Sequence, residues 1–399
     1  MCRTTTRTAH TLSAALVRHG LNMTDPNAIL EQETDPAGLF LSMMIAIVVI
    51  MQLCTNIAPA LVKPVLLDGT LISNGRYVMT YSGYDTVGAD DVPSVVGIGS
   101  SILMMAMDGG CMNEMTTVDE ARYYNFAIDG AYPYTEMVQV PALIRAHPDV
   151  VIIEIGPNSL WGWTGDPWPG MLEYNEFRFQ LASLYLEQGD YQGWYDILEP
   201  RDQTHLHTDV LDRSEAWSEY TLEAIELHLS RQIDELARPD VAAYTYVPAV
   251  GSEAWNEYLS TPNWRASKIQ DWNDTEVREY LDESMAKKKG QGVYNPRAEG
   301  TQNHAALEYT IESLTAAGIE VLIVSIPFHP WGREYLDPGQ MDGLNETYAR
   351  YSTMGGVQAL EMHWELWPKE AFSDRSHMDA DGREIFCQRV TPVVDAMLE

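Results

Sequence analysis

A serine, a histidine and an aspartate stand next to segments where the sequence predicts strands and helices. Ser101 follows a short apolar segment, and Asp374 and His377 precede the last helical segment of the chain. A serine hydroxyl becomes a strong nucleophile when a base removes its proton, and an imidazole suits that step near neutral pH. A carboxylate three residues before the histidine can hold the ring in the required tautomer. These residue types therefore indicate acyl-group chemistry at a serine.

Three further groups could stabilise the oxyanion that forms when a serine attacks an acyl carbon. They are the backbone N–H groups of Ser101 and Gly130 and the side-chain amide of Asn158. The sequence also leaves ordinary structural roles open for these residues. Ser101 could cap a helix, and Asn158 could close a turn after a strand. Asp374 could cap a helix that starts near His377.

The elements that must bring these residues together alternate between strands and helices. We predict strands at 92–98, 122–128, 150–155, 319–326 and 357–360, and helices at 101–113, 134–146, 302–317, 341–353 and 380–398. This alternation favours an α/β fold with a parallel sheet that helices cover on both faces. The carboxyl ends of parallel strands share one edge, where open α/β folds bind ligands. Ser101, Gly130 and Asn158 are all expected at that edge.

Four short motifs carry a family resemblance. They stand at 99–101 (Gly-Ser-Ser), 125–130 (Asn-Phe-Ala-Ile-Asp-Gly), 156–158 (Gly-Pro-Asn) and 374–377 (Asp-Arg-Ser-His). In this order they resemble the SGNH (GDSL-like) hydrolase superfamily, which is named after its Ser, Gly, Asn and His residues. Two positions depart from the family pattern, because Ser100 and Ser159 stand where many members have Asp. The Gly-Ser-Ser form is similar to membrane-anchored proteins of the DltD and alginate O-acetylation type.

The resemblance implies a flavodoxin-like three-layer α/β/α sandwich with a five-stranded sheet. It also implies a triad in which Ser101 is the nucleophile, His377 the general base and Asp374 the residue that orients the base. The implied activity is that of an ester hydrolase or O-acyltransferase on an acylated cell-surface glycan or a small ester, with possible envelope-biosynthesis partners. No cofactor or metal is expected. A protein of this fold that only binds glycan, or that serves as an envelope scaffold, remains the alternative.

A long insertion separates the third and fourth predicted strands. Residues 159–301 are mostly helical by pattern and carry eight of the eleven tryptophans. Trp161 and Trp163 follow the third strand directly, so they could line a site for sugar faces or acyl groups, or pack the insertion onto the domain. His329 follows the fourth strand and is a candidate substrate-binding residue, although packing is the alternative. His363, after the fifth strand, has the same two interpretations.

The N-terminal part of the chain differs in composition from the rest. Residues 1–37 are polar and predict a disordered tail, and the segment from Gly38 to Cys54 has no charged residue. We predict a transmembrane signal anchor over 38–62, with a core helix of the main domain as the alternative. Arginines precede the anchor, so the rest of the chain is expected outside the cell. A connector at 63–91 then leads to the main domain at 92–399.

The charge of the chain is strongly negative, with 58 acidic against 25 basic residues. This balance disfavours nucleic-acid binding, which needs clustered Lys and Arg. The composition resembles that of proteins from salt-loving archaea, while an acidic protein of an ordinary organism is the alternative. Four cysteines are too few for a disulfide scaffold, and no Cys/His spacing predicts a zinc site. Cys111 and Cys387 lie on two predicted helices and could pair only if these pack side by side, so free buried thiols are expected.

Overall fold

The computed structural model describes residues 36–52, 57, 61, 76, 82–89, 92–157, 159–160, 179, 182, 192–206, 210–261, 269, 272–289, 302–336 and 338–399. The chain divides into two compact units, Met1–Leu53 and Cys54–Glu399. In the first unit, helix α2 (Pro36–Gln52) contains no charged residue and buries none of its side chains. Within the ranges given, no helix combines the length and apolar character required to cross a bilayer.

A five-stranded sheet organises the second unit. Its strands are β1 (Ser94–Ile98), β2 (Arg122–Asn125), β3 (Val150–Glu154), β4 (Glu320–Ser325) and β5 (Val357–Glu361). They lie in the order β2-β1-β3-β4-β5, and every neighbouring pair is parallel. The prediction of an α/β fold with a five-stranded parallel sheet is therefore confirmed. This order places β1, the strand before Ser101, between β2 and β3. The carboxyl ends of β2 and β3 therefore flank the segment that leads to Ser101.

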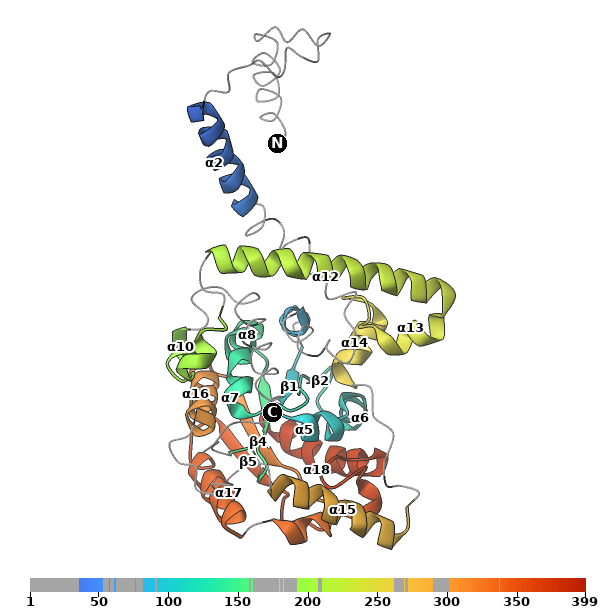
Figure 1. Ribbon diagram of the computed structural model, residues 1–399. Helices are drawn as coiled ribbons and strands as arrows, with labels where there is room; N and C mark the ends of the chain where they lie inside the picture. Colours follow the sequence, from blue (N-terminus) through green and yellow to red (C-terminus); the bar gives the residue numbers. More distant parts are fainter. Residues whose placement is uncertain are drawn as a thin grey trace. The chain divides into compact units, whose positions relative to one another are not determined.

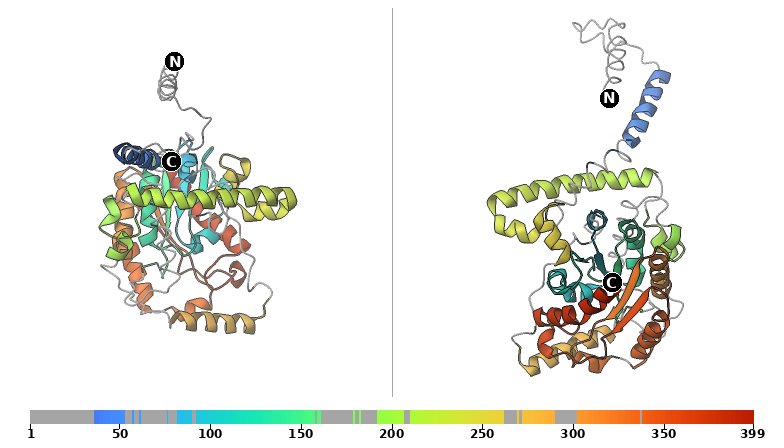
Figure 2. Two further views of the ribbon diagram at one scale, coloured as in Figure 1. Left: turned by 45° about the horizontal axis from the view of Figure 1, so that its top comes forward. Right: turned by 180° about the vertical axis from the view of Figure 1, so that it is seen from behind.

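Helices cover both faces of the sheet (Figure 1). Successive residues of a strand point to opposite faces, and Val95 and Val96 accordingly enter two separate hydrophobic cores. One core packs against helices α5 (Ser101–Ala106), α6 (Gly109–Met115) and α18 (Ala380–Leu398). The other packs against α8 (Val140–Ala146), α16 (Gln302–Ala316) and α17 (Pro338–Tyr351). Seen from behind in Figure 2, the strands lie between these two groups of helices.

Two helices that the sequence predicts as continuous are interrupted. The expected helix at 101–113 is divided into α5 and α6 because Asp108 caps a new helix by accepting a hydrogen bond from Cys111 N–H. Gly109 follows the cap and lies so close to β2 that a Cβ would stand 2.4 Å from the Tyr123 carbonyl oxygen. The expected helix at 134–146 is likewise divided into α7 (Pro133–Glu136), η2 (Met137–Gln139) and α8. Pro141, which has no N–H to donate, lies in the first turn of α8.

The described parts of the insertion are mostly helical. They comprise α10 (Gln192–Tyr195), α11 (Pro200–Gln203), α12 (Val210–Ala237), α13 (Pro239–Thr245), α14 (Glu253–Ser260) and α15 (Asp274–Lys289). Figure 2 shows the long helix α12 folding back on α13. Trp194, Trp217 and Trp255 are fully buried. These three tryptophans therefore have the packing role that Trp side chains commonly fill.

The expectation of free thiols at Cys111 and Cys387 is wrong. The two residues form a disulfide that joins α6 to α18, across a sequence separation of 276 residues. The pairing is possible because α6 and α18 pack side by side on the same face of the sheet. Spacing along the chain could not reveal this contact, because it depends on how the two helices lie in the fold.

Candidate active site

The segment from β1 to α5 presents Ser101 at the carboxyl edge of the sheet. β1 ends at Ile98, Gly99 and Ser100 form the connection, and α5 begins at Ser101. The helix N-cap is Ser100, because its Oγ accepts a hydrogen bond of 3.2 Å from the N–H of Ile102. The capping role that the sequence left open for Ser101 thus falls to its neighbour, and the Ser101 hydroxyl is available for another partner.

The partner is carried by the loop before α18. Ser373 N–H donates to the His377 carbonyl oxygen at 2.9 Å, and this bond closes a tight loop around residues 374–376. Within the loop, Asp374 Oδ1 accepts the N–H groups of Ser376 and His377, each at 2.9 Å. These two bonds fix the carboxylate relative to the histidine backbone. Asp374 therefore caps its own loop, and Asp379 is the N-cap of α18.

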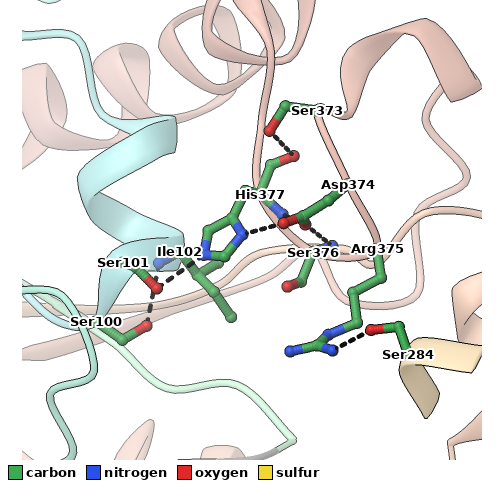
Figure 3. Close-up of polar contacts among 9 residues, drawn as sticks. All are labelled: Ser100, Ser101, Ile102, Ser284, Ser373, Asp374, Arg375, Ser376 and His377. Carbon is green, nitrogen blue, oxygen red and sulfur yellow. Dashed lines mark hydrogen bonds and ion pairs between the residues drawn. The ribbon is translucent and has the colours of Figure 1, made fainter. Parts of the chain in front are cut away.

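Ser101, His377 and Asp374 form a continuous hydrogen-bonded row (Figure 3). His377 Nδ1 lies 2.7 Å from Asp374 Oδ2, and His377 Nε2 lies 2.8 Å from Ser101 Oγ. A carboxylate can only accept, so in the neutral ring Nδ1 carries the proton and Nε2 is the acceptor. The Ser101 hydroxyl then donates to Nε2. This is the arrangement in which an imidazole can remove a proton from a serine as the hydroxyl attacks.

The electrostatics keep Asp374 ionised. Burial would raise the pKa of this carboxyl, but the hydrogen bond and charge of His377 and the two backbone N–H donors outweigh it and hold the pKa well below the usual range. The side chain of His377 remains about 22 % exposed, against about 13 % for that of Asp374. The ionised carboxylate is thus largely shielded from water, while the imidazole stays within reach of a substrate.

Two of the three predicted oxyanion donors, Ser101 and Gly130, lie within the described residues. Gly130 lies beyond the end of β2 with a φ of 64°, a left-handed conformation that favours glycine. The segment before it runs along the end of β1, because Ile128 N–H donates to the Gly99 carbonyl oxygen at 2.8 Å. Gly130 and Ser101 therefore follow adjacent strand ends at one edge of the sheet. Asn158 lies outside the described residues, as do Trp161 and Trp163.

His329 is fully buried. Its Nδ1 accepts the N–H of Trp331 at 3.2 Å, and its ring packs against the rings of Trp331 and Phe372. Burial, reinforced mainly by the charge of Lys369, lowers the pKa of His329 to about 4, so the ring is neutral near pH 7. This environment corresponds to the packing alternative that the sequence left open.

A second serine–histidine contact occurs at the ends of β4 and β5. Ser325 Oγ lies 2.6 Å from His363 Nδ1, and His363 Nε2 lies 3.1 Å from Asn345 Oδ1. Ser325 is fully buried, and its Oγ also accepts the N–H groups of Met362 and His363. Burial lowers the pKa of His363 to about 4. A hydroxyl this enclosed cannot reach a substrate, so the contact joins β4 to β5 and does not form a reactive pair.

Sequence reasoning missed Glu154, the last residue of β3. Its carboxyl group is buried and accepts a hydrogen bond of 2.8 Å from Ser100 Oγ. The available signal was an acidic residue inside an otherwise apolar strand, because Val150–Ile155 contains no other charged side chain.

Comparisons with known proteins add no family assignment. No protein-family model matches the chain, and no curated protein matches it either.

Proposed function

We propose that the chain is a serine-dependent esterase or O-acyltransferase. The observation that carries the proposal is the row of contacts from Ser101 through His377 to Asp374, which joins a hydroxyl and an imidazole 276 residues apart in sequence. A structural role explains this row poorly. The serine hydroxyl meets the ring nitrogen opposite the carboxylate, and the imidazole stays partly open to solvent.

The proposed reaction has two half-reactions. His377 Nε2 takes the proton as Ser101 Oγ bonds to the acyl carbon, and Asp374 stabilises the imidazolium. The tetrahedral intermediate collapses, His377 returns the proton to the leaving alcohol, and an acyl-enzyme remains. In the second half-reaction, His377 deprotonates water or a sugar hydroxyl as its oxygen attacks the acyl carbon. The bond from the acyl carbon to Ser101 Oγ then breaks, and His377 returns the proton to Ser101 Oγ. Water gives hydrolysis, and a sugar hydroxyl gives acyl transfer. Gly130 N–H and the Asn158 amide are proposed as oxyanion donors with Ser101 N–H.

The fold is consistent with the proposed family. The order β2-β1-β3-β4-β5 is that of flavodoxin-like sheets, which bind ligands at the carboxyl edge beside the first strand. The two hydrophobic cores on opposite faces of the sheet support a three-layer sandwich. Together with the four motifs, these features support membership of the SGNH hydrolase superfamily as a proposal.

We also propose that the chain acts outside the cell on acylated glycan of the envelope. The uncharged helix α2, whose side chains are all at least partly exposed, supports membrane attachment. The disulfide between Cys111 and Cys387 supports an oxidising location, because such bonds persist mainly outside the reducing cytosol. The glycan substrate follows from the resemblance to envelope acylation proteins.

The test uses the full-length protein, purified in detergent at high salt, with p-nitrophenyl acetate as substrate. We expect turnover by the wild-type chain and its loss in Ser101→Ala. The matched control is Ser325→Ala, which removes a buried serine that also contacts a histidine and should retain turnover per folded molecule. Equal rates for the wild type and Ser101→Ala would reject serine catalysis of this ester.

A further inference from the structure

Glu154 lies directly behind the nucleophile segment. It is the final residue of β3, the strand that pairs with β1 in register up to Ile98. Two glycines leave room for it: a Cβ on Gly99 would stand 2.8 Å from Glu154 Cβ, and a Cβ on Gly156 would stand 3.0 Å from Glu154 Oε1. Neither glycine has a positive φ, so it is this close approach that requires them. The glycines of the first and third motifs thus enclose one buried carboxyl group.

The carboxyl group holds Ser100 at two points. Glu154 Oε2 accepts the Ser100 hydroxyl at 2.8 Å and the Ser100 N–H at 3.2 Å. Because the Ser100 hydroxyl donates to Glu154, its lone pair can accept the N–H of Ile102 and start α5. The N–H of Ser100 is therefore bonded to β3 directly, and the N–H of Ile102 is linked to β3 through the Ser100 hydroxyl. Ser101 is the next residue, so the direction of its side chain depends on this attachment.

Burying the carboxyl group of Glu154 lowers the stability of the fold, and an apolar side chain that only packed at this position would not have this effect. Glu154 is about 2 % exposed, and its Oε1 has no hydrogen-bond partner among the described residues. Burial raises the pKa of Glu154, and the hydrogen bonds from Ser100 and the charge of His377 oppose this increase only in part. An apolar side chain at the end of β3 would avoid the cost of burying a polar group. Titratable groups with strongly perturbed pKa values cluster at functional sites.

We propose that Glu154 is a positioning residue, which holds Ser100 so that Ser101 Oγ stays within reach of His377 Nε2. The inference rests on the proposed function of Ser101 as the nucleophile. It assigns Glu154 no contact with the substrate. Losing the attachment should misplace the hydroxyl, and a displacement of about 1 Å at a reacting atom can reduce a rate about 10²-fold.

The test is a double-mutant cycle with Glu154→Ala and Ser100→Ala, measured as kcat and KM for p-nitrophenyl acetate. We expect each single variant to lower kcat about 10- to 100-fold with KM changed less than about threefold, because the loss concerns the reacting hydroxyl and not binding. The double variant should resemble the single variants, since both remove the same link. Glu154→Gln should recover most of the lost turnover, because its amide oxygen still accepts both Ser100 donors.

Asp395→Ala is the matched control for loss of a carboxylate. Asp395 accepts bonds from Thr116, Thr117 and Tyr123 at a position on α18 remote from Ser101, so this variant should lower the melting temperature without lowering kcat. Two results would overturn the inference. One is an unchanged kcat in folded Glu154→Ala, and the other is a double variant whose loss is the product of the two single losses.

A spectroscopic measurement separates this inference from the proposed function. In protein with ¹⁵N-labelled histidine, the Nε2 signal of His377 reports its hydrogen bond with Ser101, and Ser101→Ala supplies the reference without that bond. We expect Glu154→Ala to shift the signal toward the reference, whether or not the chain turns over the ester tested. An unchanged signal in Glu154→Ala would contradict the positioning role, whereas a wild type without turnover would contradict only the proposed function.

Discussion

Replacing Asp374 by asparagine should disable the histidine while leaving the loop in place. Asp374 Oδ1 accepts two backbone N–H groups, and an asparagine carbonyl oxygen can take over both bonds. The new amide nitrogen must then face His377 Nδ1, where the carboxylate oxygen lay at 2.7 Å. An amide N–H donates, so Nδ1 becomes the acceptor and the proton moves to Nε2. The ring would then present a proton to Ser101 and could not remove one.

The expected loss in kcat is about 10³- to 10⁴-fold, as for the wrong tautomer in other serine triads. At about 1.4 kcal/mol per factor of ten, this corresponds to about 4–6 kcal/mol of transition-state stabilisation. The assay is p-nitrophenyl acetate hydrolysis at saturating substrate, with kcat and KM determined separately. KM should change little, because Asp374 lies on the side of His377 away from Ser101 (Figure 3).

Asp379→Asn is the matched control, because Asp379 caps α18 through Oδ1 and an asparagine cap is equally suitable. It should keep wild-type kcat. The reasoning would be refuted if folded Asp374→Asn kept more than about a tenth of wild-type kcat while Ser101→Ala was inactive. It would also fail if the two asparagine variants lost turnover equally.

Three further predictions concern stability. Burial lowers the pKa values of His329 and His363 from 6.5 to about 4, so between these values the unfolded chain binds more protons and stability falls as the pH falls. The free energy of unfolding falls by at most about 3 kcal/mol for each histidine. Guanidinium unfolding at pH 7 and pH 4.5 should show a smaller fall in a variant that carries both His329→Gln and His363→Gln. For Glu154 the sign is reversed, because burial raises its pKa in the folded chain. Wild-type stability therefore falls as the pH rises above the pKa that Glu154 has in the unfolded chain. The gain in melting temperature of Glu154→Gln over the wild type should accordingly grow from pH 4 to pH 7. Replacing both Cys111 and Cys387 by serine should lower the free energy of unfolding by about 2–5 kcal/mol. A reductant-insensitive melting temperature in the wild type would contradict that disulfide.

The positions of β1, β3 and β4 could be predicted because each is a short, mainly apolar run next to residues that break a strand. The segment Val95–Ile98 shows why this works: all its residues are buried, and a strand covered on both faces has no polar positions to obscure the pattern. Their common edge then follows from parallel pairing. The meeting of Ser101 with His377 does not follow from pattern alone, and it required a resemblance that joined motifs at opposite ends of the domain.

Other features depend on tertiary contacts that no local pattern encodes. At the break between α5 and α6, the cap at Asp108 is local, but the close approach of Gly109 to the backbone of β2 is a tertiary contact. The disulfide arises because α6 lies beside α18. The role of Glu154 could not be predicted, because the sequence of a buried strand does not indicate which neighbouring residue its carboxylate will contact. The choice of Ser101 over Ser100 has a structural reason, since the Ser100 hydroxyl is engaged by Glu154 and Ile102.

The most direct test of the account is the labelling of the full-length protein with a fluorophosphonate, followed by mass spectrometry of its peptides. A serine activated by a histidine attacks the phosphorus, displaces fluoride and remains covalently phosphonylated, whereas an ordinary serine does not react. We predict stoichiometric labelling at Ser101, which is lost in His377→Ala and unchanged in His363→Ala. An absence of label, or a label on another serine, would contradict the account.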